Sequence, residues 1–176
     1  IFIVYKKWLT SDLDRIKEIP HIKYLYGVLG IDIVASLFEI NMEITVIIML
    51  GTNDCKTYYH APAEVIGKGI EKLIRQVRQA DESIKILLIS PILLGEEVWK
   101  SQFDPEFDTE SVNTSKKLKA VYQKIAIEQG TDFLAASDYA KPSPIDQEHL
   151  DEEGHRRLAE AVYHKLAKMQ LGTGAA

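Results

Sequence analysis

Apolar residues follow two different periods along the chain, and from residue 44 onward these periods predict strands and helices in alternation. Three short runs are apolar at nearly every position, as in strands that are buried on both faces. We expect strands at 44–50, 84–90 and 132–135. Elsewhere apolar side chains recur every three or four residues, which is the spacing of an amphipathic helix. We expect helices at 62–80, 111–129 and 151–169.

This alternation predicts the fold class. Buried strands that are each followed by a helix belong to a parallel sheet with helices on both faces. Because such crossovers are right-handed, we expect an α/β protein, a three-layer α/β/α sandwich around a parallel, flavodoxin-like sheet. The 176 residues fit a single domain, which we place at 1–170, followed by a flexible Gly- and Ala-rich tail at 171–176.

The first 43 residues fit this pattern less well than the rest of the chain. Apolar runs predict strands at 1–5 and 31–35, with the start of a helix at 12–17. Only eight residues separate residue 35 from residue 44, whereas a crossover between parallel strands needs about a dozen or more. We therefore expect 1–43 to be an atypical or shortened part of the domain.

Composition and charge exclude several classes of protein. The chain is 46% apolar and 27% charged, with a net charge of −5 and no concentrated basic segment, which argues against a nucleic-acid partner. No apolar run approaches the length of a membrane span. The single cysteine and the lack of a recognisable signal peptide favour a cytoplasmic location. The sequence leaves the oligomeric state open, including a homo-oligomer.

Candidate chemistry begins with the string Asp146-Gln147-Glu148-His149, in the segment before the last predicted helix. A histidine serves well as a general base near neutral pH, and a carboxylate on its second ring nitrogen fixes the tautomer and stabilises the imidazolium. Four residues in a loop that turns into a helix can bring the two side chains together. The alternative is a solvated pair that caps the following helix.

A second string, Gly51-Thr52-Asn53-Asp54, follows the first predicted buried strand. Asn53 can aim its amide at an oxygen that gains negative charge in a transition state. The alternative is a turn whose polar side chains bond their own backbone. Because the carboxyl ends of parallel strands share one edge of a sheet, both strings are expected at the same edge.

The runs VIIMLGTND at 46–54 and DQEHLDEEGHRRLAEAV at 146–162 together resemble the GDSL, or SGNH, hydrolase family, and especially its arylesterase-like bacterial members. The resemblance covers about residues 44–167, with both motifs in the family's order. It implies that His149 is a catalytic base, that Asp146 orients it and that Asn53 is an oxyanion-hole donor. It further implies a serine-type hydrolase of small carboxylic esters, of the lipase/acylhydrolase, arylesterase or carbohydrate esterase type, without a metal or organic cofactor.

The sequence departs from this family at the nucleophile. The family's Gly-Asp-Ser string does not occur. Ser11 is the only serine before Ser36, and it is either a displaced nucleophile or a plain N-cap of the helix at 12–17. For a glycine N–H in the oxyanion hole the candidates are Gly27 and Gly30, of which we take Gly30. The missing string keeps a second hypothesis open, a catalytically impaired member that binds an acyl or sugar ligand or a partner protein.

Other reactive side chains favour simpler interpretations. Cys55 has no neighbouring base in the sequence, so we expect a small buried residue and not a nucleophile. His155 lies six residues after the histidine of the Asp-x-x-His string, the wrong spacing for two metal ligands on one helical face, and we predict no metal site. Tyr58, Tyr59 and Trp99 either line an apolar pocket or belong to the core.

Overall fold

The structure, a computed structural model, describes residues 2–6 and 44–171. Its helices and strands are, in chain order, β1 (Phe2–Lys6), β2 (Ile44–Ile48), α2 (Ala63–Ala80), β3 (Lys85–Ser90), α3 (Thr109–Gln129), β4 (Asp132–Ala135) and α4 (Glu152–Leu171). Three single turns of 3-10 helix join them: η2 (Asn53–Cys55), η3 (Thr57–Tyr59) and η4 (Ala136–Asp138). Three expectations lie outside the described residues: the strand at 31–35, the helix start at 12–17 and the short crossover.

The four strands form one sheet in the order β1-β2-β3-β4. β2, β3 and β4 run parallel, with Ile47 beside Leu87. β1 runs antiparallel to β2, with Phe2 beside Ile48. The expectation of a parallel sheet is therefore correct for three strands, whereas the first strand runs the other way. An apolar run has the same pattern in either direction, so the sequence could not determine the direction of β1.

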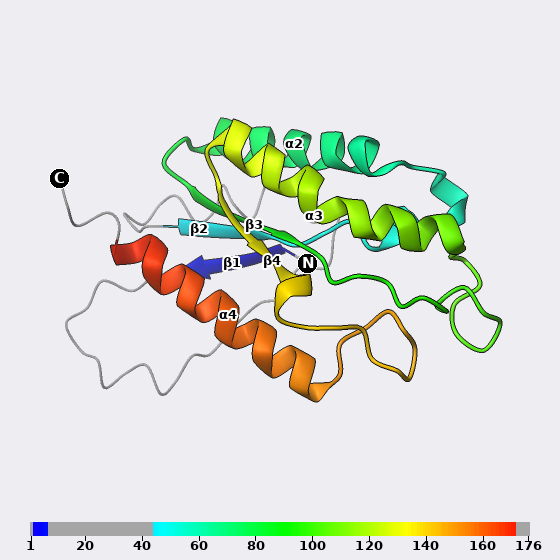
Figure 1. The fold of residues 1–176 in the computed structure, drawn as a ribbon. Helices are drawn as coiled ribbons and strands as arrows, with labels where there is room; N and C mark the ends of the chain where they lie inside the picture. The colour runs from blue at the N-terminus through cyan, green and yellow to red at the C-terminus, as the bar shows by residue number, and fades with distance from the viewer. Residues whose placement is uncertain (1, 7–43, 172–176) are drawn as a thin grey trace.

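Helices cover both faces of the sheet, as Figure 1 shows. On one face Val46, Ile48 and Leu88 pack in a buried cluster with apolar residues of α2 and α3. On the other face Ile47 and Leu87 pack in a second cluster with residues of α4. The side chains of one strand alternate between these two clusters, as the pleat requires. The three-layer α/β/α sandwich expected from the sequence is confirmed.

The ends of the helices follow local signals in the sequence. Gly130, directly after α3, has a left-handed φ of 58°. At the start of α4 the Asp151 carboxylate accepts a backbone N–H at 2.7 Å, as expected for an N-cap. α3 begins two residues earlier than expected, because Asp108 and Ser111 form a capping box. Asp108 accepts the Ser111 N–H at 2.7 Å, and the Ser111 hydroxyl accepts the Asp108 N–H at 3.1 Å.

The segments that follow β2, β3 and β4 come together at one edge of the sheet (Figure 1). The Thr57 N–H donates to the Glu106 carbonyl at 2.8 Å, which ties the segment after β2 to the segment after β3. The Gly95 N–H donates to the Gln147 carbonyl, also at 2.8 Å, which ties the segment after β3 to the segment after β4. The parallel strands therefore bring both sequence motifs to the same edge. No helix in the described part of the chain is both long and apolar enough to cross a lipid bilayer.

The capping box gives a first prediction. Replacing Asp108 with alanine leaves the backbone N–H of Ser111, in the first turn of α3, without its side-chain acceptor, so the free energy of unfolding should fall by about 1 kcal/mol. Urea denaturation measures this loss. Asp108→Asn keeps an acceptor at the N-cap and serves as the matched control, with a smaller loss expected. Equal stability of Asp108→Ala and the unmodified chain would contradict the prediction.

Candidate active site

Asp146 and His149 are in direct contact in the loop between β4 and α4. Nδ1 of His149 lies 2.9 Å from Oδ2 of Asp146. The other carboxylate oxygen, Oδ1, accepts the backbone N–H groups of Glu148 and His149, each at 3.0 Å. One carboxylate therefore fixes the turn with one oxygen and the imidazole with the other. The His149 side chain is 71% exposed, and no hydrogen bond within residues 44–171 engages its Nε2.

The charge state of Asp146 determines which way the ring hydrogen bond runs. Partial burial opposes the charge of this carboxyl group, but the N–H groups of Glu148 and His149, together with the imidazole, outweigh burial and lower its pKa. The Asp146 carboxylate therefore stays ionised at pH values where an ordinary aspartate takes up a proton. Its contribution to stability is complete above the pKa of an unfolded aspartate and is lost as the pH falls through the lowered pKa of the folded state. An ionised carboxylate only accepts hydrogen bonds, so Nδ1 of His149 donates the proton, and in the neutral ring Nε2 is then an acceptor.

Ser143 closes the loop that carries this pair. Its N–H donates to the His149 carbonyl at 2.7 Å, and its own carbonyl accepts the Gln147 N–H at 2.8 Å. The Ser143 hydroxyl accepts the Ile145 N–H at 3.1 Å. Ser143 itself is buried. The Asp146–His149 pair is therefore presented by a closed, internally bonded turn anchored on a buried residue.

Asn53 begins the η2 turn just beyond β2, where three groups fix the backbone. Gly51 has a φ of 122°, and a Cβ at this position would lie 2.3 Å from the Tyr122 hydroxyl. That hydroxyl donates to the Leu50 carbonyl at 2.8 Å, and the Cys55 thiol donates to the Gly51 carbonyl at 3.4 Å. Asn53 is exposed, and its amide makes no hydrogen bond to any other described residue. Within the described part of the chain, no protein group therefore competes with a ligand for this amide.

A charged cluster lies between the two motifs. Lys56, directly after η2, donates to Asp104 at 3.1 Å and also to Glu106, both in the segment after β3. Glu148 is partly buried, and its charge interacts with those of Lys56, Asp104 and His149. Burial is the largest influence and raises the pKa of Glu148, whereas the positive charges of His149 and Lys56 oppose that rise. The Asn53 turn and the Asp146–His149 loop therefore lie within electrostatic reach of each other.

The predicted site residues divide into two groups. Asn53, Asp146 and His149 lie at the same edge of the sheet, after β2 and β4. Ser11 and Gly30 lie outside the described residues, as does the other glycine candidate, Gly27. The structure thus describes the positions of the expected base His149, its carboxylate partner Asp146 and the amide donor Asn53.

Ser90 and Cys55 have side chains of nucleophilic type, and both are buried. Ser90, at the end of β3, is 0% exposed. Cys55 is 5% exposed, and burial, assisted by the charge of Asp54, raises the pKa of its thiol to about 12. The interpretation of Cys55 as a small buried residue is confirmed. Tyr58 and Tyr59 are exposed, so they do not belong to the core.

Sequence reasoning missed the parts played by Tyr122 and Ser143. Tyr122 lies on the inward face of α3, as its spacing predicts, but its hydroxyl also holds the end of β2. A glycine at a strand end signals that another group approaches the backbone closely. Which group approaches depends on how α3 packs on the sheet, and the local sequence does not contain that information.

The comparison with protein-family models identifies the family. The model of the GDSL-like lipase/acylhydrolase family matches residues 9–157, which is most of the chain. The chain belongs to this family. The resemblance in the two motifs is thereby confirmed. A comparison with curated proteins found no match.

Solved structures agree with this assignment. The chain is 31% identical to a carbohydrate acetylesterase from Sinorhizobium meliloti, covering 78% of this chain and 65% of that one, with a TM-score of 0.68. Another carbohydrate acetylesterase family member from the same organism is 30% identical, with coverages of 80% and 68% and a TM-score of 0.68. An aryl esterase from M. smegmatis, 24% identical with coverages of 78% and 66% and a TM-score of 0.66, shares the fold. The chain thus spans about two thirds of the length of these structures.

The strand end before Asn53 gives a second prediction. Gly51→Ala places a side chain at a φ of 122° and against the Tyr122 hydroxyl, so the free energy of unfolding should fall by about 1–3 kcal/mol. Gly69 in α2 is the matched control, because a Cβ there meets nothing within 4 Å. Gly69→Ala should therefore leave stability unchanged or raise it. Urea denaturation of both variants makes the comparison, and equal effects would contradict the prediction.

Proposed function

We propose that this chain is a serine-type hydrolase of small carboxylic esters. The observation that carries the proposal is the Asp146–His149 pair, in which the ring is held through Nδ1 while Nε2 is free of hydrogen bonds from the described residues. That arrangement suits a general base whose acceptor nitrogen faces a substrate or a nucleophile. Membership of the GDSL-like lipase/acylhydrolase family supports the same reaction class.

In the proposed reaction a serine hydroxyl attacks the ester carbonyl while Nε2 of His149 takes its proton. The new C–O bond turns the carbonyl oxygen into an oxyanion, which the amide of Asn53 stabilises by donating a hydrogen bond. Collapse of this intermediate breaks the bond to the leaving alcohol, which receives the proton from the imidazolium. Water then hydrolyses the acyl-enzyme by the same steps, and Asp146 stabilises the imidazolium each time it forms.

The nucleophile belongs to the residues before Ile44 in this proposal, with Ser11 as the candidate and Gly30 as the backbone donor of the oxyanion hole. Buried Ser90 and Cys55 are poor alternatives, because neither side chain is accessible to a substrate. No metal or organic cofactor takes part. For the substrate we propose an acetylated carbohydrate or an aryl ester, a choice supported by the acetylesterases and the aryl esterase that the chain resembles.

A second candidate function rests on one observation, the absence of a Gly-Asp-Ser string from the sequence. A family member without a working nucleophile would bind an acyl or sugar ligand, or a partner protein, at the same edge of the sheet. The two candidates differ in a property that can be measured directly, namely whether one serine is chemically activated.

Labelling with a fluorophosphonate separates them. The proposed hydrolase should form a stoichiometric adduct on a single serine, located by mass spectrometry, and should turn over p-nitrophenyl acetate. Both signals should be lost in His149→Ala. Absence of an adduct, together with turnover no better than that of His149→Ala, would overturn the hydrolase and leave the binding function.

The Asp146 carboxylate gives a sharper prediction for the active enzyme. Asp146→Asn keeps an oxygen for the backbone N–H groups but presents an amide donor to Nδ1 of His149. The ring should then carry its proton on Nε2 and be unable to accept one from the nucleophile, so kcat should fall on the order of 10³- to 10⁴-fold. Steady-state kinetics with p-nitrophenyl acetate tests this expectation. Loss of less than tenfold would argue against the orientation role of Asp146.

A further inference from the structure

Gln147, between the two members of the Asp146–His149 pair, has an unusual backbone. Its φ is 62°, in the left-handed region that favours glycine. Such a conformation costs on the order of 1–3 kcal/mol and persists only when surrounding contacts impose it. Contacts with the surrounding residues must therefore impose this conformation on Gln147.

Two hydrogen bonds tie Gln147 to the segment after β3. The Gly95 N–H donates to the Gln147 carbonyl at 2.8 Å. The Glu97 N–H donates to Oε1 of the Gln147 side chain at 2.9 Å. We call these two bonds the Gln147 latch. The latch joins the loop that carries His149 to a different strand-following segment, while the N–H of Gln147 bonds within its own loop to Ser143.

Gly95 makes room for the Gln147 latch because it has no side chain. A Cβ on Gly95 would lie 2.4 Å from Oε1 and 2.5 Å from Cβ of Gln147, closer than real atoms approach. A side chain at residue 95 would therefore push Gln147 out of place. The left-handed backbone of Gln147 therefore brings its side chain into space that only a glycine at residue 95 leaves open.

We propose that Gln147 is a positioning residue, whose latch to Gly95 and Glu97 sets the orientation of the Asp146–His149 pair. Asp146 Oδ1 binds the N–H groups of Glu148 and His149, the two residues that follow Gln147. A change in the backbone at Gln147 moves those N–H groups, and with them the carboxylate and the ring. The role in catalysis rests on the proposed ester hydrolysis, whereas the orientation of the ring can be measured without it.

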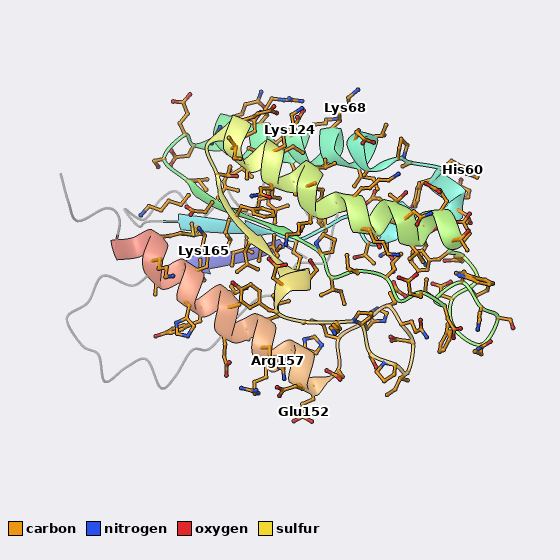
Figure 2. All side chains as sticks on the ribbon, in the orientation of Figure 1. His60, Lys68, Lys124, Glu152, Arg157 and Lys165 are labelled. Carbon is orange, nitrogen blue, oxygen red and sulfur yellow. The ribbon has the colours of Figure 1, made fainter. Side chains whose placement is uncertain are left out.

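Three substitutions separate the latch from the backbone strain. Gln147→Gly accepts the left-handed φ but lacks Oε1. Gln147→Asn tolerates this φ better than most residues but is one methylene too short to reach Glu97. Gln147→Glu replaces the amide oxygen Oε1 with a carboxylate oxygen, which can still accept the Glu97 N–H. His60→Gly is the matched control, because His60 is also left-handed, with a φ of 44°. Figure 2 shows His60 far from Glu152, the residue that begins α4 shortly after His149.

Kinetics with p-nitrophenyl acetate should give the following pattern. Gln147→Gly and Gln147→Asn should lower kcat by roughly 10²-fold with little change in KM, because misplacement of a catalytic group affects the transition state more than binding. Gln147→Glu should restore most of kcat, and His60→Gly should match the unmodified chain. Gly95→Ala should also lower kcat, and the double variant with Gln147→Gly should be no worse than Gln147→Gly alone. Rates for Gln147→Gly equal to those of the unmodified chain, or additive losses in the double variant, would overturn the proposal.

A second measurement does not depend on turnover. ¹⁵N NMR of the imidazole, assigned with His149→Ala at mildly alkaline pH, should show the proton of His149 on Nδ1. In Gln147→Gly and Gly95→Ala the ring should exchange between tautomers, whereas His60→Gly should leave the spectrum unchanged. An unchanged ring in Gln147→Gly would refute the positioning role. If the unmodified chain shows the Nδ1 proton but no turnover, the proposed hydrolase fails and the positioning of the ring stands.

Discussion

Burial of both faces of the parallel strands is the constraint on which the remaining structure depends. Side chains of β2 and β3 alternate between a cluster with α2 and α3 and a cluster with α4, so none of these three helices can be removed without exposing the sheet. Each crossover returns the chain to the same starting edge, so the three parallel strands β2, β3 and β4 all end at the opposite edge. The segments after β2, β3 and β4 therefore lie together at that edge, and both motifs lie in these segments.

Within that edge, one carboxylate organises the loop that carries the histidine. Asp146 uses one oxygen for two backbone N–H groups and the other for the imidazole, so the same charge holds the turn and the ring. Its lowered pKa keeps it ionised at pH values where an ordinary aspartate begins to take up a proton. The loop is closed by buried Ser143 and latched to the neighbouring segment by Gln147. The position of the His149 ring therefore depends on the hydrogen bonds of its loop as well as on its contact with Asp146.

The amide side of the site is held differently. Asn53 follows a strand end that is fixed by a tyrosine hydroxyl from α3 and by a glycine with a positive φ. Lys56, with Asp104 and Glu106, then ties this turn to the segment that also receives Gln147. The two motifs are thus connected through the segment after β3, which is long and contains no strand or helix. Long connections of this kind in compact domains often serve function.

The sequence by itself determined the three parallel strands, the three helices and the Asp146–His149 and Asn53 motifs, because periodicity and short motifs are properties of neighbouring residues. Only the tertiary structure decided that β1 runs antiparallel, since an apolar run has the same pattern in both directions. The same holds for the contacts of Gly51 with Tyr122 and of Gly95 with Gln147. These pairs are about 50 to 70 residues apart, and they meet only after helices and loops have packed on the sheet, which no local pattern records.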